Sequence, residues 1–204
     1  MAEIETYGTG EVERIADRAS IQLAFARDGK NRASAVSALT ERIGAVEELL
    51  DRDGVQVRDR RLSVHDRWEG KRRAGAVATQ SYHVRITDLA VLNDLVADLV
   101  AAEPADLSGP NWELAEHDEA RLEAQGAAVA DARRRAEGYA VALGRELGEL
   151  VRISDGASNH GPVAYAARAM SFAESAGRPD IAQLSLEPEP VSVTAMCTMT
   201  WTIA

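Results

Sequence analysis

Residues 118–143 read DEARLEAQGAAVADARRRAEGYAVAL, and this stretch decides the fold. Apolar residues recur every seven positions along it, which predicts one long amphipathic helix whose stripe faces the core. The stripe consists of Leu122, Val129, Ala136 and Leu143, with Ala132 and Tyr139 in the intervening turns. Because much of the stripe is alanine, the helix can lie close to a sheet, and we expect the four large side chains to supply the buried bulk.

The ends and the outer face of this helix are also marked. Asp118 is the predicted N-cap, and Gly144 and Gly148 are the predicted stop signals. Asp131 and Arg135 stand four positions apart on the predicted outer face, in the order that favours an ion pair. If Leu143 is buried, Leu143→Ala should lower the free energy of unfolding by about 2–5 kcal/mol.

The rest of the chain alternates between strand and helix patterns. Period-two alternation predicts strands at 18–27, 55–68, 76–86, 107–114, 149–154 and 191–203, after a short strand or arm that leads into a tight turn at Gly8-Thr-Gly10. Helical spacing predicts a helix that ends at Leu50 and another over about 87–102. This order predicts an α+β fold in which antiparallel sheet packs against three main helices. We expect a single domain over 1–204, with a mobile loop at about 155–184.

Charge and composition limit the classes of function. The 204 residues carry a net charge of −10, which argues against nonspecific binding to nucleic acid or anionic lipid. No apolar run approaches the ~18 residues of a membrane helix. The first seven residues have neither the basic start nor the apolar core of a signal peptide, so we expect a cytoplasmic protein. The single cysteine, Cys197, excludes an internal disulfide.

No group of residues predicts a catalytic or metal site, and we expect no cofactor. Glu13 stands where a dinucleotide-binding loop beginning at Gly8 needs its third glycine. The histidines are far apart, and we expect His65 and His83 to be ordinary neighbours across a hairpin, with a weak metal pair as the alternative. A triad of Ser154, Asp155 and His160 lacks the strand-turn-helix setting of a nucleophilic serine. We expect Cys197 to be a core residue, because alternation places it on the apolar face of the last strand.

Two segments are candidates for a contact surface. The first is a basic hairpin. It is able to dock against an acidic patch on another copy or partner; the alternative is that it is only a solvated surface. Its arginines are Arg58, Arg60, Arg61, Arg67, Arg72 and Arg73. Nucleic-acid binding is less favoured there, because Trp68 is the only nearby aromatic residue and alternation predicts that it points inward. The second is the loop at 155–184, in which Tyr165, Met170 and Phe172 are able to bury against a neighbouring subunit.

Several stretches, in sequence order, resemble the SIMPL domain family, also called DUF541. They are Gly8-Thr-Gly10-Glu11-Val12, the strand from Ile21 to Phe25, the helix with Ala35, Leu39 and Ile43, Leu62-Ser63-Val64, the strand from Tyr82 to Ile86, Ala128-Val-Ala130-Asp131-Ala132-Arg133 with Ala136-Glu137 and Leu143-Gly144, and Val151-Arg-Ile-Ser154. The resemblance covers nearly the whole chain. It implies an α+β fold and a tendency to assemble, since some relatives form large rings. It also implies no established enzymatic activity, and a loose link to oxidative-stress defence and the cell envelope.

The sequence therefore favours a non-enzymatic, SIMPL-like scaffold or binding module that self-associates through sheet edges and the 155–184 loop. The alternative is a small-ligand-binding protein or an enzyme with a pocket under that loop, using residues such as His160 and Arg168. A third and weaker hypothesis is nucleic-acid binding by the basic hairpin.

Overall fold

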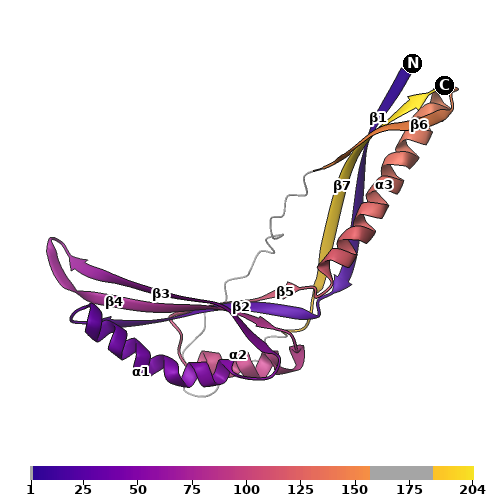
Figure 1. Ribbon diagram of the computed structural model, residues 1–204. Coiled ribbons are helices and arrows are strands. Elements are labelled where there is room, and N and C mark those ends of the chain that lie inside the picture. The colour runs from indigo at the N-terminus through magenta and orange to yellow at the C-terminus, as the bar shows by residue number, and fades with distance from the viewer. Residues whose placement is uncertain (1, 157–185) are drawn as a thin grey trace. The chain divides into compact units, whose positions relative to one another are not determined.

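The computed structural model describes residues 2–156 and 186–204, which form two compact units (Figure 1). The central unit comprises residues 16–113 with 186–189, and the terminal unit comprises residues 2–15, 114–156 and 190–204, so that it holds both chain ends. Each unit has its own hydrophobic core. The α+β class predicted from the sequence is confirmed. The prediction of a single domain over 1–204 did not anticipate this division.

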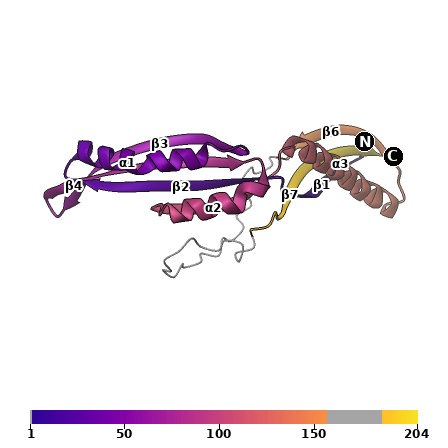
Figure 2. The same ribbon diagram turned by 90° about the horizontal axis from the view of Figure 1, so that it is seen from below.

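The central unit is a four-stranded antiparallel sheet with helices on one face. Its elements are β2 (Arg18–Gly29), α1 (Arg32–Leu50), β3 (Val55–Glu69), β4 (Arg72–Ile86), a short 3₁₀ turn η1 (Leu89–Val91), α2 (Leu92–Ala101) and β5 (Asp106–Glu113). The strands lie in the order β3-β4-β2-β5, and every neighbouring pair is antiparallel. This βαββαβ arrangement is the ferredoxin-like motif. Helices α1 and α2 cover the same face of the sheet (Figures 1 and 2).

Local sequence explains most of the central unit. Ile21, Leu23 and Phe25 are buried, as their alternation in β2 predicted. Helix α1 begins with a reciprocal capping box, in which the side chains of Asn31 and Ser34 each bond the other's backbone N–H. The helix then buries one stripe on the sheet. That stripe consists of Ala35, Leu39, Val46 and Leu50.

The terminal unit is a three-stranded antiparallel sheet with one long helix on one face. Its elements are β1 (Ala2–Ile15), α3 (His117–Ala142), β6 (Leu147–Asp155) and β7 (Pro190–Ile203), and the strand order is β1-β7-β6. The first and last strands pair along their whole length, from Ala2 opposite Ile203 to Ile15 opposite Pro190. The buried side chains of β7 alternate as predicted. They are Val193, Ala195, Cys197, Met199 and Trp201.

The predicted helix is present in α3, but the side chains that it buries were predicted wrongly. Its core contact is a row of alanines spaced four residues apart: Ala120, Ala124, Ala128, Ala132, Ala136 and Ala140. Leu122, Val129, Tyr139 and Leu143 are exposed, Leu143 by 63%. Leu143→Ala should therefore change stability by less than about 0.5 kcal/mol instead of the 2–5 kcal/mol predicted above. The predicted N-cap was also wrong, because Glu116 and not Asp118 occupies that position. Of the two predicted stop signals, Gly148 does not end the helix, because it lies inside β6.

Gly8 and Gly10 explain why α3 uses alanine. The expected tight turn at these glycines is wrong, because both lie inside the extended strand β1. A Cβ atom added at Gly8 would lie 2.0 Å from the carbonyl oxygen of Ala128, and one added at Gly10 would lie 2.0 Å from that of Ala124. The helix backbone thus rests directly on the strand backbone. Only glycine on the strand and alanine on the helix allow this approach.

Polar groups hold the same contact in register. The Thr6 hydroxyl donates to the carbonyl oxygen of Ala132 at 2.8 Å. The backbone N–H of Thr9 donates to the Asp131 carboxylate at 3.2 Å, and this bond contributes most to holding the pKa of Asp131 below its usual value. Asp131 also forms the predicted ion pair with Arg135, at 3.0 Å. The Asp131 carboxylate does not lie on the outer face as predicted. It faces β1, where it accepts the hydrogen bond from the Thr9 backbone N–H, a donor that β7 does not satisfy.

Gly8→Ala should destabilise the terminal unit by about 2 kcal/mol or more, because the new methyl group cannot fit without moving α3 off the strand. The matched control is Gly126→Ala on α3, where an added Cβ meets nothing within 4 Å. That change should stabilise by about 0.5–1 kcal/mol, because it only removes the entropic cost of a helical glycine. Hydrogen exchange of peptides from β1 and α3 measures both. Equal protection in wild type and Gly8→Ala would contradict the close packing.

Candidate interaction surfaces

The basic hairpin lies in β3 and β4 of the central unit, and most of its charge is neutralised within that unit. Arg67 pairs with Asp28 at 2.8 Å, and Arg73 pairs with Asp66 at 2.8 Å. Arg61 approaches Asp59 at 3.9 Å. Arg58 and Arg72 form no ion pair with any residue that the structure describes. The six arginines that the sequence grouped together are therefore not one free basic surface.

Arg60 belongs to a polar network under helix α1. Its guanidinium donates two hydrogen bonds to the Glu47 carboxylate, at 3.3 Å and 2.9 Å, and the Tyr82 hydroxyl donates to the same carboxylate at 2.9 Å. The bonds from Arg60 lower the pKa of Glu47, whereas burial and the neighbouring carboxylate raise the pKa of Tyr82. This network joins the helix to the sheet. Arg60 thus has a structural role within the central unit, and its place in the contact surface stays a prediction.

The end of the hairpin differs from the rest. Strand β2 stops pairing with β4 at Gly29 opposite Ala76, so residues 67–75 form a two-stranded extension, here called the hairpin tip, which runs past α1 (Figure 2). Trp68 lies in this tip and is 60% exposed. Its predicted inward position is wrong, because no strand or helix of the described residues covers the tip. Lys71 and Arg72, also in the tip, form no ion pair within the described part of the chain.

The expectation that His65 and His83 are neighbours across the hairpin is wrong, and the alternative of a metal pair there falls with it. In the observed register, His65 lies opposite Val77 and His83 lies opposite Asp59. The described residues contain no group of three or more His, Cys, Asp or Glu side chains that is able to hold a metal ion.

The terminal unit has an acidic sheet face that the sequence reading missed. Residues 4, 6, 8, 10 and 12 of β1 face α3, so the alternate residues point to the opposite face, which no described helix or strand covers. These include Glu3, Glu5, Glu11 and Glu13, all exposed, and none forms an ion pair with a described residue. Tyr7 lies between them, and exposed Met196 of β7 lies opposite Thr9. We call this surface the acidic face. The acidic face could have been predicted from the alternation of glutamate with small or apolar residues along β1. The expectation of only a short strand or arm at residues 1–10 does not include it.

Strand β6 forms the opposite edge of the same sheet. It pairs with β7 on one side only. Three of its apolar side chains are about half exposed: Leu150 by 45%, Val151 by 53% and Ile153 by 54%. Helix α3 leaves them about half exposed, because its alanine row packs on β1 and β7. The β6 edge therefore combines a free strand backbone with uncovered apolar side chains.

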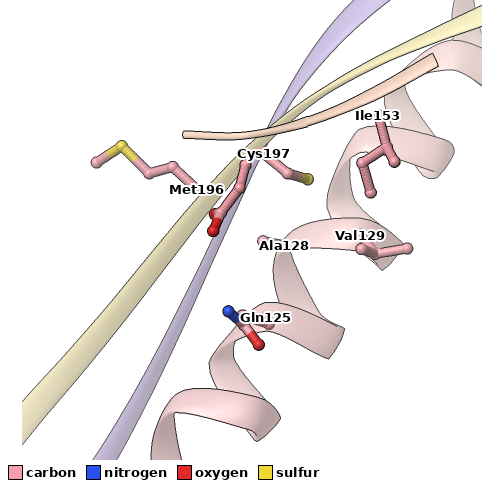
Figure 3. Close-up of a pocket in the computed structure, with 7 residues that line it drawn as sticks. Gln125, Ala128, Val129, Ile153, Met196 and Cys197 are labelled. Carbon is pink, nitrogen blue, oxygen red and sulfur yellow. The ribbon is translucent and has the colours of Figure 1, made fainter. Parts of the chain in front are cut away.

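A pocket of about 300 Å³ lies between α3 and β6 (Figure 3). Val129 and Ile153 line it from the helix and the strand, and Gln125 and Cys197 also line it, whereas the Met196 side chain points away from α3. The Cys197 side chain is buried, as predicted. Burial, with smaller contributions from the charges of Asp155 and Asp131, raises the pKa of its thiol. The raised pKa disfavours the thiolate, which is the reactive form of this side chain.

The remaining predicted contact residues lie outside the described residues. They are Tyr165, Met170 and Phe172, together with His160 and Arg168 and nearly all of the predicted loop at 155–184. The triad of Ser154, Asp155 and His160 therefore has only its first two members within the structure. Among the described residues, no helix is both long and apolar enough to cross a membrane.

Comparison with known proteins agrees with the resemblance found in the sequence. The model of the family described as SIMPL, protein of unknown function (DUF541), matches residues 4–201. Among curated proteins, none matches this sequence. One similar solved structure is a Burkholderia cenocepacia protein provisionally named an amidohydrolase/peptidase, with 16% identity and a TM-score of 0.25. The match covers 60% of this chain and 34% of that chain. Similarity this low carries no argument about fold or activity.

Cys197 should react slowly with iodoacetamide in the native protein, and its reaction should begin at a higher pH than in the urea-unfolded chain. A raised pKa leaves less thiolate at any given pH, and burial limits access to the sulfur. Since the chain has one cysteine, the rate is measured directly by mass spectrometry. Equal rates for native and unfolded protein at the same pH would contradict this description of the pocket.

Proposed function

The chain belongs to the SIMPL family, and we propose that it works as a self-associating scaffold or binding module with no catalytic step of its own. The β6 edge carries this proposal. Soluble monomers usually protect a free strand edge with charge, proline, a bulge or a covering element. Among the described residues, this edge has no proline and no covering element. Register shifts lie on both sides of Leu150, but three half-exposed apolar side chains favour addition of another strand.

The sequence of β6 suits pairing with a second copy. Glu149 and Arg152 flank Leu150 and Val151. An antiparallel pairing of two copies, centred between Leu150 and Val151, would bring Glu149 of each copy near Arg152 of the other across the register shift at this point of β6, and opposite charges on neighbouring strands stabilise a sheet. This arrangement is isologous, because each copy uses the same surface.

A second candidate function is binding of a small apolar ligand in the pocket beside Val129 and Ile153. It rests on the pocket volume of about 300 Å³, which is at the lower end of the range for ligand sites. Native mass spectrometry that detects a bound molecule, lost in Val129→Trp, would favour this candidate. The location in the cytoplasm and the link to stress defence, both expected above, stay predictions.

Val151→Lys combined with Ile153→Lys should lower the mass in solution at least about twofold, because two charges on the β6 edge oppose strand pairing. Light scattering behind a sizing column, over a tenfold range of concentration, measures it. The control is Val141→Lys, a more exposed apolar residue on α3, at 76%, which should leave the mass unchanged. A wild-type mass of 21.9 kDa at every concentration, that of a single chain, would overturn the proposal.

A further inference from the structure

We infer that the hairpin tip of one copy docks on the acidic face of another copy. The inference rests on the proposed self-association and names a second contact, distinct from the β6 edge. It starts from Trp68, whose ring is uncovered on a two-stranded extension. Tryptophan in such a position is typical of residues that anchor protein interfaces, because the large ring loses much exposed surface on contact.

The charges beside Trp68 specify the chemistry of the partner. Within the tip, Arg67 and Arg73 are neutralised by Asp28 and Asp66, whereas Lys71 and Arg72 lack acidic partners among the described residues. The tip thus presents one aromatic ring beside two positive charges and one exposed carboxylate, Glu69, which lies opposite Arg72 and forms no ion pair with a described residue. Its complement is a surface with exposed apolar groups at the centre and carboxylates around them.

The acidic face has this arrangement. Tyr7 and Met196 lie near its centre, 52% and 40% exposed. Glu3 and Glu5 lie toward one end of β1, and Glu11 and Glu13 lie toward the other. Within the described residues these carboxylates bond only to uncharged hydroxyl groups, as in the hydrogen bond that Ser192 donates to Glu11. They are therefore free to pair with Lys71 and Arg72 of an incoming tip.

A second copy fits this tip better than nucleic acid or a lipid surface. Only Lys71 and Arg72 are basic side chains without an ion pair in the tip, among the described residues, which is fewer than phosphate-backbone binding usually uses. The tip also has one aromatic residue, whereas binding of single-stranded nucleic acid uses several stacking side chains. By contrast, every copy carries both the basic tip and an acidic surface of matching character.

The contact joins two different surfaces and is therefore heterologous. Repeated from copy to copy, it builds a ring if the rotation closes and a filament if it does not. The β6 contact alone stops at a pair of chains. Assemblies larger than two chains thus require the tip, and their mass should fall as salt screens its charges.

Charge reversal tests the inference. Lys71→Glu with Arg72→Glu, or Glu11→Lys with Glu13→Lys, should each reduce the assembly to about twice 21.9 kDa, the mass of two chains joined by β6. Mixing the two variants in equal amounts should restore the wild-type mass, because each reversed surface then meets its complement. Trp68→Ala should weaken the large assembly without changing charge. The control is Arg58→Glu with Arg145→Glu, which changes the net charge equally, away from the tip, and should keep the wild-type mass.

Two outcomes overturn the inference while the proposed self-association stands or is left aside, and a third overturns both. In one, the wild-type mass is that of two chains, the β6 variant halves this mass, and the tip variant leaves it unchanged. This result would support self-association and contradict the tip contact. The other is a tip variant that keeps the wild-type mass but loses binding to phosphatidylglycerol vesicles, which would make the tip a lipid contact. If the wild type is a single chain throughout, the proposed function fails first and this inference falls with it.

Discussion

The terminal unit depends on one close contact, in which the backbone of β1 lies against the backbone of α3. Gly8 and Gly10 leave no side chain between strand and helix, and the alanines at 124, 128 and 132 fill the little space that remains. A row of residues spaced four apart is inclined to the helix axis by about 26°, so a strand that follows this row crosses the helix at a shallow angle. Thr6 and Asp131 then fix the register with hydrogen bonds to backbone groups.

The same contact determines which surfaces stay uncovered. A helix held over β1 and β7 cannot also cover β6, and the apolar side chains of that edge remain half exposed. Since α3 occupies one face of β1, the glutamates at alternate positions are left on the other face. Both the β6 edge and the acidic face thus follow from the placement of one helix. The pocket beside Val129 and Ile153 is the space left between α3 and β6.

The sequence predicted the kinds and order of the elements because hydrophobic alternation is strong in β2, β4 and β7 and helical spacing is strong in α1. It misplaced the buried face of α3, because a seven-residue pattern of large side chains is a stronger signal than a four-residue pattern of alanines. Which pattern faces the core depends on Gly8 and Gly10, more than a hundred residues away. Trp68 was misplaced for a related reason. Alternation gives the face of a strand, but only the end of pairing at Gly29 shows that nothing covers that face.

The candidate surfaces show the same dependence on contacts that are distant in sequence. Counted along the chain, the basic hairpin is a run of arginines that suggests one docking site. In the structure, Arg60 donates to Glu47, which also accepts from Tyr82. Arg67 pairs with Asp28 and Arg73 pairs with Asp66, so these three positive charges are neutralised inside the central unit. The acids that neutralise them are brought near by folding, and no count of the hairpin alone includes Asp28 or Glu47. What remains unpaired is a short tip around Trp68, and unpaired charge, not total charge, determines what a surface attracts.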